Sequence, residues 1–501
     1  MFVRKKNNKS GKVSVQVIDK SSGKYKVLKT IGSSSDAQDI EKLIKKGKQF
    51  IQQYTGLQEI DFNDYNRSYT QVLSSIIAHK LVGVELVLGK IFDDIGFNQI
   101  GDTLFRDLVL YRLIYPRSKL KTTEYLYRYE QKEYTEDDIY RYMDKLHSSQ
   151  KELVQSISYQ HTLKVLKGDI SVVFYDVTTI YFEADIEDEF RKTGFSKEGK
   201  HQNPQIVLGL LVSSGGYPMA YEIFEGNKFE GHTMLPVLES FRAKYNLKQL
   251  IVVADSGLLS SDNIKDLIEN EYEFILGARI KNEKQYIKNQ ILQLQLKDSE
   301  SQVIEKGDLR LIIAYSDLRA KKDRYNREKG LRKLEKQLKT GKLTKSNINN
   351  RGYNKFLEME GEISIKINQE KILEDHKWDG LKGYLTNSKI SNNEILENYQ
   401  QLWLIEKAFR IAKTDLKIRP IYHFKKRRIE AHICLNFVAY KIYKELERIL
   451  KAKNSSLSPE KVIEILQNIY ELTLLTPNNT IVKQKIILTD EQRQIQLLFN
   501  F

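Results

Sequence analysis

The stretch LKQLIVVADSG, residues 247–257, is an apolar run that changes abruptly to Asp255, serine and glycine. A short run of β-branched and other apolar residues bounded by turn residues is typical of a buried strand. The segment SVVFYD, residues 171–176, has the same form and ends in Asp176. Ligands of open α/β sheets bind outside the carboxyl ends of the strands, so two strands that end in aspartate indicate a site at one edge of a sheet.

Neighbouring segments extend this sheet. The segment PQIVLGLLVSSGGYPMAYEIFEG (204–226) predicts two strands joined at a Gly-Gly turn, and YEFILGARI (272–280) predicts another strand after a helix that starts at SSDNIKDLIEN. Three consecutive strands followed by alternating helix and strand predict an α/β fold with a sheet of mixed direction.

The rest of the chain surrounds this predicted core. Residues 12–31 alternate around Ser-Ser-Gly and predict a β-hairpin, a helix is expected from about 36 to 55, and helical periodicity runs from 69 to 165 with breaks at IGFNQIG and YPRSK. We predict that residues 1–165 form a hairpin plus helical domain for docking onto DNA or a partner. The core is expected in two parts, 166–280 and 371–450. A charged insertion (281–370), with one or two exposed helices in 317–358, separates them, and residues 451–501 form a C-terminal tail.

Charge and composition narrow the function. The net charge is +15, which a lysine-rich composition or a polyanionic partner would explain. Basic residues cluster at 45–48, 319–345 and 423–428, and this clustering favours a nucleic acid. The single cysteine, Cys434, excludes a disulfide within the chain and a Cys-rich zinc site. We expect a cytoplasmic protein with no membrane contact, because no signal peptide and no apolar run of membrane-spanning length is found.

A second candidate segment is YQQLWLIEKAFRIAK, residues 399–413, in a helix expected from about 392 to 415. Tyr399, Glu406 and Lys413 are spaced by seven residues, close to two helical turns, so they are expected to share one stripe beside an apolar one. Glu406 then lies at the edge of buried surface and needs a partner. That partner is either an ion pair with Arg410 or Lys407, or a metal ion.

Three carboxylates could form one site. If Asp176, Asp255 and Glu406 converge, they repel each other unless cations neutralise them, and hard divalent ions with oxygen ligands do so. Two such ions can activate a water or a 3′-hydroxyl and stabilise the leaving oxygen of a phosphodiester. Each acid also has a structural interpretation: Asp176 could cap a turn, Asp255 could belong to an ordinary strand-to-helix turn, and Glu406 could form the ion pair. The order strand–Asp, hairpin, strand–Asp, insertion, helix–Glu favours the shared site.

The sequence resembles the DDE transposases of bacterial insertion sequences, in the subgroup with a Y-(2)-R-(3)-E-(6)-K signature. Tyr399, Glu406 and Lys413 match that spacing, whereas Leu402 occupies the position of the signature arginine. Other segments extend the resemblance over nearly the full length, namely residues 4–34, GNKFEGHT (226–233), LWLIEKAFRIAK (402–413) and RPIYHFKKRRIEAHI (419–433).

The resemblance implies an RNase H-like core with a large insertion before the last acidic helix, and it implies that Asp176, Asp255 and Glu406 hold Mg²⁺ or Mn²⁺, with two ions expected. It implies hydrolytic nicking at the ends of the element, followed by attack of the 3′-hydroxyl on target DNA. The expected partners are double-stranded DNA, as terminal inverted repeats and target, and a second copy of the chain on paired ends.

Further residues are candidates for binding DNA. By resemblance, Tyr399 and Lys413 contact DNA near the scissile phosphate, although both could simply cover the core stripe, and Arg410 could replace the contact of the missing arginine. The loop FSKEGKHQNP contains Lys197, Lys200 and His201, which either grip DNA or are solvated, and phosphate contact is expected for Arg419, His423 and the KKRR run. His432 and Cys434 are expected to pack in the core. The competing functions are a catalytically inactive or repurposed DNA-binding protein and an RNase H-like nuclease without transposition.

Overall fold

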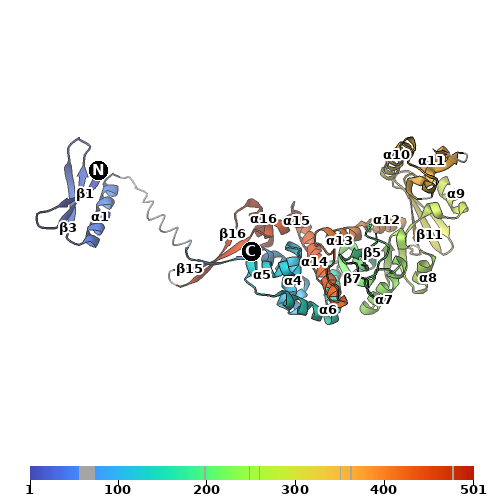
Figure 1. Cartoon of the computed structure of the whole chain (residues 1–501), viewed down its shortest axis with the longest axis horizontal. Coiled ribbons are helices and arrows are strands. Elements are labelled where there is room, and N and C mark those ends of the chain that lie inside the picture. The colour runs from blue at the N-terminus through green and yellow to red at the C-terminus, as the bar shows by residue number, and fades with distance from the viewer. Residues whose placement is uncertain are drawn as a thin grey trace. The chain divides into compact units, whose positions relative to one another are not determined.

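The structure is a computed structural model that describes residues 1–55, 74–196, 199–247, 249–258, 260–349, 351–360, 364–476 and 479–501. Its chain divides into two compact units, shown with their elements in Figure 1. The first unit comprises Met1–Ala78 and Leu472–Gln484, and the second comprises His79–Glu471 and Lys485–Phe501.

The N-terminal segment of the first unit is a three-stranded antiparallel sheet covered by a helix. The elements are β1 (Phe2–Asn7), β2 (Val13–Asp19), β3 (Lys26–Ser34) and α1 (Ala37–Thr55). The predicted hairpin and the helix after it are therefore confirmed. The helix packs closely on the sheet at Gly47, where a Cβ would lie 3.0 Å from a methyl group of Val3.

A second small sheet has the strand order β16-β15-β4. Its strands are β4 (Ile76–Leu81), β15 (Tyr470–Leu475) and β16 (Ile481–Ile486). The expectation of helix from 69 to 165 is wrong at β4, and residues 69–73 lie outside the described residues. Pairing with distant chain decides this strand, because the Leu475 amide donates to the Ser75 carbonyl at 2.8 Å and the Val82 amide to the Ile469 carbonyl at 3.0 Å.

The helices that follow β4 confirm the rest of the expected helical region. They are η1 (Glu85–Gly89), α3 (Lys90–Ile95), η2 (Phe97–Ile100), α4 (Thr103–Ile114), α5 (Lys119–Glu130) and α6 (Glu136–Val165). The breaks fall at the predicted IGFNQIG and YPRSK segments. Polar side chains cap the N-termini of α4 and α6. Asp102 accepts hydrogen bonds from the amides of Leu104 and Phe105, and Thr135 forms a capping box with Asp138.

The second unit contains a large mixed sheet, with eight strands among the described residues in the order β10-β11-β14-β9-β8-β5-β6-β7. Strand β8 pairs in parallel with β5 and with β9, and the other neighbours are antiparallel. The strands are β5 (Val172–Tyr181), β6 (Gln205–Ser213), β7 (Pro218–Glu225), β8 (Ile251–Ala254), β9 (Glu273–Ala278), β10 (Ser301–Lys306), β11 (Leu309–Tyr315) and β14 (Leu381–Thr386). The predicted α/β fold with a mixed sheet is confirmed.

One predicted strand is longer than expected. The expectation that the first strand ends at Asp176 is wrong, because β5 continues to Tyr181 and pairs with β6 as far as Gln205. The residues VTTIY after Asp176 are mostly β-branched, and their pairing with β6 extends the strand. Strand β8, in contrast, ends at Ala254, directly before Asp255, as predicted.

The remaining elements connect these strands, cover the sheet or pack on other helices. The helices are α7 (Met234–Tyr245), α8 (Ser261–Glu269), α9 (Gln285–Gln293), α10 (Asp317–Lys339), α11 (Gln369–His376), α12 (Asn392–Gln400), α13 (Trp403–Thr414), α14 (Lys426–Ala452), α15 (Pro459–Leu466) and α16 (Asp490–Phe499). The short 3₁₀ turns are η3 (Ser214–Gly216), η4 (Glu230–His232), η5 (Ser256–Leu258), η6 (Ile280–Asn282), η7 (Lys345–Asn347) and η8 (Gly352–Phe356). A separate two-stranded ribbon consists of β12 (Leu357–Glu360) and β13 (Ser364–Ile367).

The expectation of one helix from 392 to 415 is wrong, because the chain tightens between α12 and α13. The Leu402 amide donates to the Tyr399 carbonyl at 3.1 Å, and the Ile405 amide donates to the Leu402 carbonyl at 3.2 Å. These are i to i+3 bonds, which wind the backbone more tightly than an α-helix and shift the phase of the side chains. Tyr399 is consequently buried while Glu406 is exposed, so the two do not share one regular stripe.

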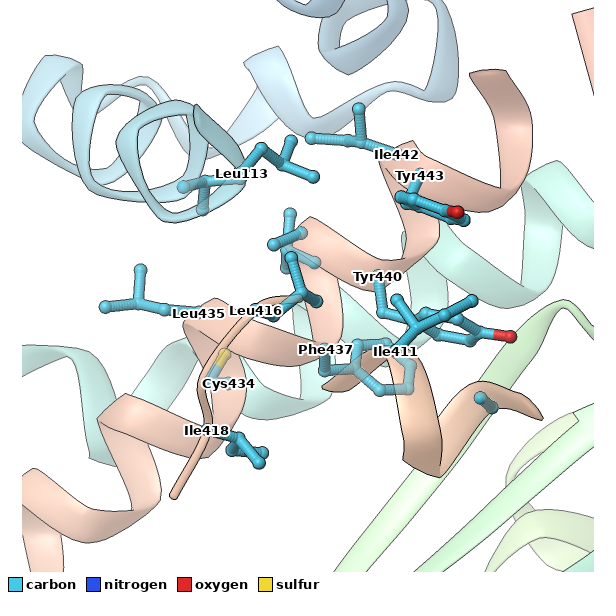
Figure 2. Close-up of a cluster of buried hydrophobic side chains, with 14 of the residues drawn as sticks. Leu113, Ile411, Leu416, Ile418, Cys434, Leu435, Phe437, Tyr440, Ile442 and Tyr443 are labelled. Atoms are coloured by element: carbon cyan, nitrogen blue, oxygen red, sulfur yellow. The ribbon is translucent and has the colours of Figure 1, made fainter. Parts of the chain in front are cut away.

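Two apolar clusters lie on the two faces of the large sheet. On one face α12, α13, α14 and the earlier helices α4 and α6 form the larger cluster, and on the other face α7 and α8 pack with β5, β6 and β9. Figure 2 shows side chains of the larger cluster, contributed by α4, α13, α14 and the segment between α13 and α14. His432 and Cys434 are buried in α14, which confirms that they pack in the core.

Candidate active site

Asp176 and Asp255 occupy adjacent positions on two neighbouring strands. Strands β5 and β8 run parallel with Tyr175 opposite Ala254, so the next residues on the two strands, Asp176 and Asp255, lie side by side. Asp176 is half-buried and Asp255 is exposed. Two carboxylates so placed repel each other unless a proton or a cation neutralises them.

The same row of residues continues across the next two strands. Ala254 of β8 pairs with Leu276 of β9, so Gly277 follows Asp255 in the row. Gly277 in turn pairs with Tyr384 of β14. The row therefore runs from β5 to β14 as two acids, a glycine and a tyrosine.

Tyr399, carried by α12, covers the glycine of this row. Its ring packs edge-on against Tyr384, with 4.8 Å between the ring centroids. A Cβ at position 277 would collide with the Tyr399 hydroxyl, and it would lie 3.2 Å from the Ser256 amide nitrogen. Glycine at 277 thus makes room for the Tyr399 hydroxyl next to the segment that begins at Asp255.

Both aspartates are on the face of the sheet that α13 covers. Side chains alternate between the two faces of a strand, so Phe174 shares the face of Asp176. Phe174 belongs to the same buried cluster as Phe409 of α13, and so does Val253, which shares the face of Asp255.

Glu406 lies in the first turn of α13, the helix that packs on β5. The positive end of the helix dipole is there, and it stabilises a carboxylate. Within the described chain no ion pair joins Glu406 to Arg410, and Lys407 instead pairs with Glu447 of α14, with 2.5 Å between Nζ and Oε1. The structural interpretation of Glu406 as an ion-pair residue is therefore wrong.

The structural interpretations of the two aspartates have different outcomes. Asp176 accepts a hydrogen bond from the Val177 amide at 2.8 Å, but the strand continues past it, so no turn is capped there. Asp255 accepts a hydrogen bond from the Gly257 amide, as in an ordinary strand-to-helix turn. One carboxylate oxygen of Asp255 serves this turn.

Lys382 supplies a cation that the sequence analysis missed. It lies two residues before Tyr384 on β14, and its Nζ is 4.4 Å from the centroid of the Tyr399 ring and 5.3 Å from that of Tyr384. Burial lowers the pKa of Lys382, whereas the carboxylates of Asp255 and Glu406 raise it. The alternation in LKGYLTN places the lysine and the tyrosine on one face and was the available signal.

The donor set suits a hard divalent ion, because the three candidate side chains are all carboxylates. Among the described residues, however, no three His, Cys, Asp or Glu side chains are close enough together to hold a metal ion. The register brings Asp176 and Asp255 together on one face, and α13 brings Glu406 to the same face. The three side chains are therefore of the chemical type that a hard divalent ion takes, but the structure does not bring all three within ligating distance of one another.

The candidate DNA-binding residues of α13 are at its surface. Arg410 is exposed and Lys413 is half-buried, whereas Leu402, at the position of the signature arginine, is buried at 6% exposure. An exposed arginine and a half-buried lysine can both reach a phosphate.

The loop candidates gather around Tyr181 at the end of β5. Lys200 Nζ lies 5.3 Å from the centroid of the Tyr181 ring, and the Arg419 guanidinium carbon lies 5.9 Å from it. His201 is exposed and accepts a hydrogen bond from the Ser196 amide at 3.4 Å. Lys197 lies outside the described residues.

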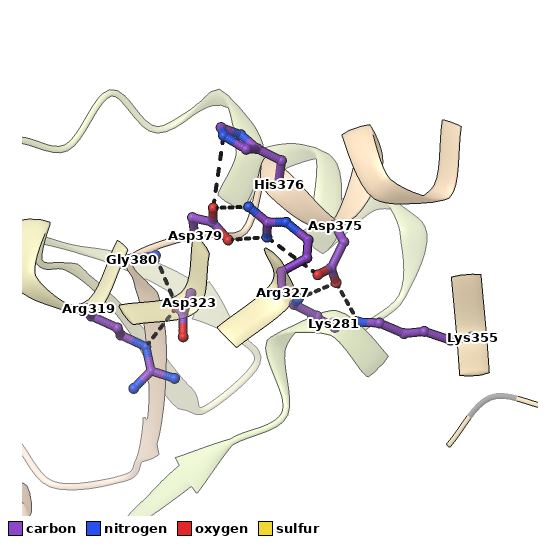
Figure 3. A network of polar contacts seen from close by, with 9 residues as sticks. All are labelled: Lys281, Arg319, Asp323, Arg327, Lys355, Asp375, His376, Asp379 and Gly380. Atoms are coloured by element: carbon purple, nitrogen blue, oxygen red, sulfur yellow. Dashed lines mark hydrogen bonds and ion pairs between the residues drawn. The ribbon is translucent and has the colours of Figure 1, made fainter. Parts of the chain in front are cut away.

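A cavity of about 540 Å³ lies between α10 and the strands β9 and β14. Its lining includes Arg319, Arg327 and Lys382. The network in Figure 3 holds α10 there, because Arg327 forms a bidentate ion pair with Asp379, at 2.6 Å for the first bond, and also approaches Asp375 at 3.6 Å. These hydrogen bonds raise the pKa of Arg327. Helix α10 is thereby fixed beside β14, the strand that carries Lys382.

The chain belongs to the family described as the transposase DDE domain, whose family model matches residues 167–442. It is a DNA transposase, an enzyme that cleaves DNA and transfers strands. Enzymes of this family generally use divalent metal ions. None of the helices in the described ranges is long and apolar enough to cross a membrane.

Two solved structures are similar to this chain. One is a piggyBac transposase synaptic complex with hairpin DNA, at 10% identity and a TM-score of 0.39, covering 77% of this chain and 76% of that one. The other is a Mos1 transposase paired-end complex with the left transposon end, at 10% identity and a TM-score of 0.16, covering 34% of this chain and 56% of that one. No curated protein sequence matches the chain.

Proposed function

We propose that this transposase mobilises a bacterial insertion sequence, cutting DNA at the ends of the element and joining the 3′ ends to target DNA. Asp176, Asp255 and Glu406 are the catalytic carboxylates of the proposal. The observation that carries it is the pairing of β5 with β8, which sets Asp176 beside Asp255 on the face covered by the helix of Glu406. We also assign this sheet to an RNase H-like core.

The three carboxylates would hold Mg²⁺ or Mn²⁺, and we propose two ions. Bound metal would lower the pKa of a water or a 3′-hydroxyl and stabilise the leaving oxygen of a phosphodiester. The residues of the chain would bind and orient the DNA. The Lys382 ammonium would provide positive charge beside the acids. The Tyr399 hydroxyl, which lies over Gly277, would donate a hydrogen bond to the DNA or accept one from it.

The signature assigns further roles. We propose that Tyr399, Glu406 and Lys413 form the Y–E–K part of a Y-(2)-R-(3)-E-(6)-K signature. Leu402 is buried and cannot contact DNA as an arginine would. Arg410, exposed one turn after Glu406, is the proposed replacement. We propose DNA contacts for Lys197 and His201, and phosphate contacts for Arg419 and His423.

The other parts of the chain receive supporting roles. Residues 1–165 would dock DNA, residues 166–280 and 371–450 would form the catalytic core, residues 281–370 would be the insertion and residues 451–501 the tail. The partners would be double-stranded DNA with terminal inverted repeats and a second copy of the chain on paired ends, in the cytoplasm. Since phosphate contacts dominate such binding, affinity should fall steeply with salt.

The test is cleavage of a labelled DNA that carries the flanks of the gene, with Mg²⁺ or Mn²⁺. Wild type is compared with Glu406→Gln, which keeps the shape and removes the charge, and with Glu397→Gln, an exposed glutamate of α12, as the matched control. We expect metal-dependent nicks at the element ends for wild type and Glu397→Gln, and none for Glu406→Gln, with DNA binding retained. Equal nicking by Glu406→Gln would refute the three-carboxylate site.

Two other functions predict different results. An inactive or repurposed DNA-binding protein would bind tightly without nicking, and an RNase H-like nuclease would cut without preference for the ends. Terminal inverted repeats on both sides of the gene would support the transposase.

A further inference from the structure

A second cavity, of about 490 Å³, is lined by residues of α4, α5, α6 and the segment between α13 and α14. Its lining includes Arg112, Lys119, Arg419, His423 and His432, all of them basic. Arg112 is 7% exposed and Lys119 is 5% exposed. Two buried cations at one cavity are unusual, because removing a charge from water is costly unless an anion accompanies it.

Within the described part of the chain, these buried cations have no anionic partner. Neither Arg112 nor Lys119 forms an ion pair or a side-chain hydrogen bond there, and no carboxylate lines the cavity. Two acids of α6 have other partners: Glu136 accepts a hydrogen bond from the Tyr140 hydroxyl at 2.7 Å, and Asp144 pairs with Arg427 and Arg428, at 2.9 Å and 2.7 Å.

The histidines at the cavity are also incompletely bonded. His432 Nε2 lies 3.0 Å from the Ile418 carbonyl oxygen, but its buried Nδ1 has no partner among the described residues. The His423 ring lies 5.4 Å from the His432 ring and 6.0 Å from that of Tyr140. The cavity lining thus combines guanidinium and ammonium groups with the imidazoles of two histidines.

We propose that this cavity is a phosphate-binding site and that a phosphodiester of the bound DNA occupies it. The identity of the DNA rests on the function proposed above, whereas the phosphate chemistry rests on the cavity alone. A guanidinium fork and an ammonium are the groups that recognise phosphate, one through paired hydrogen bonds and the other as a point charge. The α5 N-terminus at Ser118, which also lines the cavity, adds its partial positive charge.

Burial and the repulsion between neighbouring cations lower the pKa values of the lining residues. Burial lowers the pKa of Arg112 to about 10 and the pKa of His423 to about 3, and for His423 the nearby Lys119 and Arg112 add to the effect. Burial also lowers the pKa of Lys119, with a further contribution from Arg112. A bound phosphate would reverse these effects by supplying negative charge.

DNA is the favoured source of the phosphate because the cavity adjoins the candidate DNA-binding residues. Arg419 lines the cavity and also contacts the Tyr181 ring at the end of β5, the strand that carries Asp176. Exposed Arg117 and Lys417 complete the mouth of the cavity. A DNA backbone leaving the sheet edge past Tyr181 would meet this basic opening.

The test uses the full chain and four proteins: wild type, Lys119→Gln, Lys119→Arg and Lys121→Gln. Lys121 lies on the same helix as Lys119, its side chain is 43% exposed and it pairs with Glu124, so it is the matched control. Binding of a fluorescent duplex carrying the gene's flank is measured against salt concentration, and thermal stability is measured with inorganic phosphate and with chloride at equal ionic strength.

We expect Lys119→Gln to weaken duplex binding roughly tenfold and to lower the slope of log affinity against log salt by about one. Its melting temperature should stay equal or rise, because an uncompensated buried charge is removed. Lys121→Gln should change neither affinity nor slope. Lys119→Arg keeps the positive charge and should therefore retain most of the duplex affinity. A lysine with only a structural role would not make the affinity depend on that charge.

Each outcome decides the proposal. If Lys119→Gln is no longer stabilised by inorganic phosphate but binds the duplex as tightly as wild type, the cavity is a site for free phosphate. That result would overturn the assignment to DNA. Unchanged duplex affinity, salt slope and phosphate response in Lys119→Gln would overturn the site itself. An effect of phosphate that is equal in wild type, Lys119→Gln and Lys121→Gln would indicate an adventitious ion only. If wild type does not nick DNA but Lys119→Gln binds DNA more weakly than wild type, the catalytic proposal is wrong and the phosphate-site proposal is supported.

Discussion

The Lys382 ammonium lies 4.4 Å from the centroid of the Tyr399 ring, beside the row that contains Asp255. The carboxylates of Asp255 and Glu406 interact electrostatically with this ammonium, so the lysine is a protein cation near two of the acids that we propose hold a divalent metal. A cation of the protein and a metal ion repel each other, and the magnitude depends on their separation and on the local dielectric.

Replacing Lys382 should therefore tighten metal binding. In Lys382→Met the repulsion is removed, and we expect the Mn²⁺ dissociation constant to fall several-fold, equivalent to about 1 kcal/mol. Electron paramagnetic resonance of free Mn²⁺ measures this directly, without relying on catalysis. Lys417→Met, at an exposed lysine after α13, is the control and should leave the constant unchanged. A weaker affinity in Lys382→Met would mean that the lysine organises the acids instead of competing with the metal.

Gly277 and Tyr399 should be energetically coupled. A methyl group at position 277 would collide with the Tyr399 hydroxyl, so Gly277→Ala should destabilise the protein by about 1–3 kcal/mol. Tyr399→Phe removes that hydroxyl, and the double variant should recover much of the loss. Urea unfolding of the two single variants and the double variant measures the coupling. Additive losses would show that the hydroxyl does not occupy the space of the missing Cβ.

The ion pair of Lys407 with Glu447 should make stability depend on pH. Burial alone would raise the pKa of Glu447, but hydrogen bonds from Lys407 and Lys444 outweigh it and lower the pKa from 4.5 to about 2. Because the folded state lowers this pKa, the stabilisation is present above pH 4.5 and is lost as the pH falls toward 2. The contribution of the Glu447 carboxylate to the free energy of unfolding is about 3 kcal/mol at neutral pH.

Melting curves from pH 7 to acid of wild type and Glu447→Gln test this expectation. The variant should be less stable at neutral pH, and its curve should approach that of wild type in acid. Glu464→Gln, at an exposed glutamate of α15, should run parallel to wild type throughout. A constant gap between wild type and Glu447→Gln at every pH would contradict the assignment, since the loss would then come from packing.

The cluster in Figure 2 should be a main source of stability. Phe437 of α14 is 5% exposed and packs on Tyr221 of β7, with 5.0 Å between the ring centroids. Phe437→Ala should lower the free energy of unfolding by about 3–5 kcal/mol, because the removed ring leaves a cavity that the helices cannot fully close. Leu497→Ala, at a leucine that is 83% exposed, should stay within about 0.5 kcal/mol of wild type in the same denaturant titration.

Local patterns were sufficient for much of the fold. The apolar runs before Asp176 and Asp255 and the Gly-Gly turn between β6 and β7 were predicted from short stretches of sequence and are present. Each depends on neighbouring residues alone, through apolar patterning or turn chemistry. The same patterns, with the spacing of the acids and the resemblance they support, led to the family that the match over residues 167–442 shows.

Local patterns did not predict the structure where hydrogen bonds or packing with distant segments decide it. The strand β4 forms because β15 pairs with it, β5 runs past Asp176 because β6 pairs with it, and α12 and α13 separate at a tightened turn. In each case hydrogen bonds or packing outweigh the local preference of the segment.

The sequence by itself determined which side chains could do chemistry, namely three carboxylates in a given order with basic residues nearby. Only the tertiary structure decided which of them meet. Strand register sets Asp176 beside Asp255 and leads on to Gly277, and Tyr399 and Lys382 reach that row from other elements. Arg112 and Lys119 meet His423 at a cavity for the same reason. Spacing along a strand or helix follows from backbone geometry, whereas neighbours across elements follow from the pairing and packing of the whole chain.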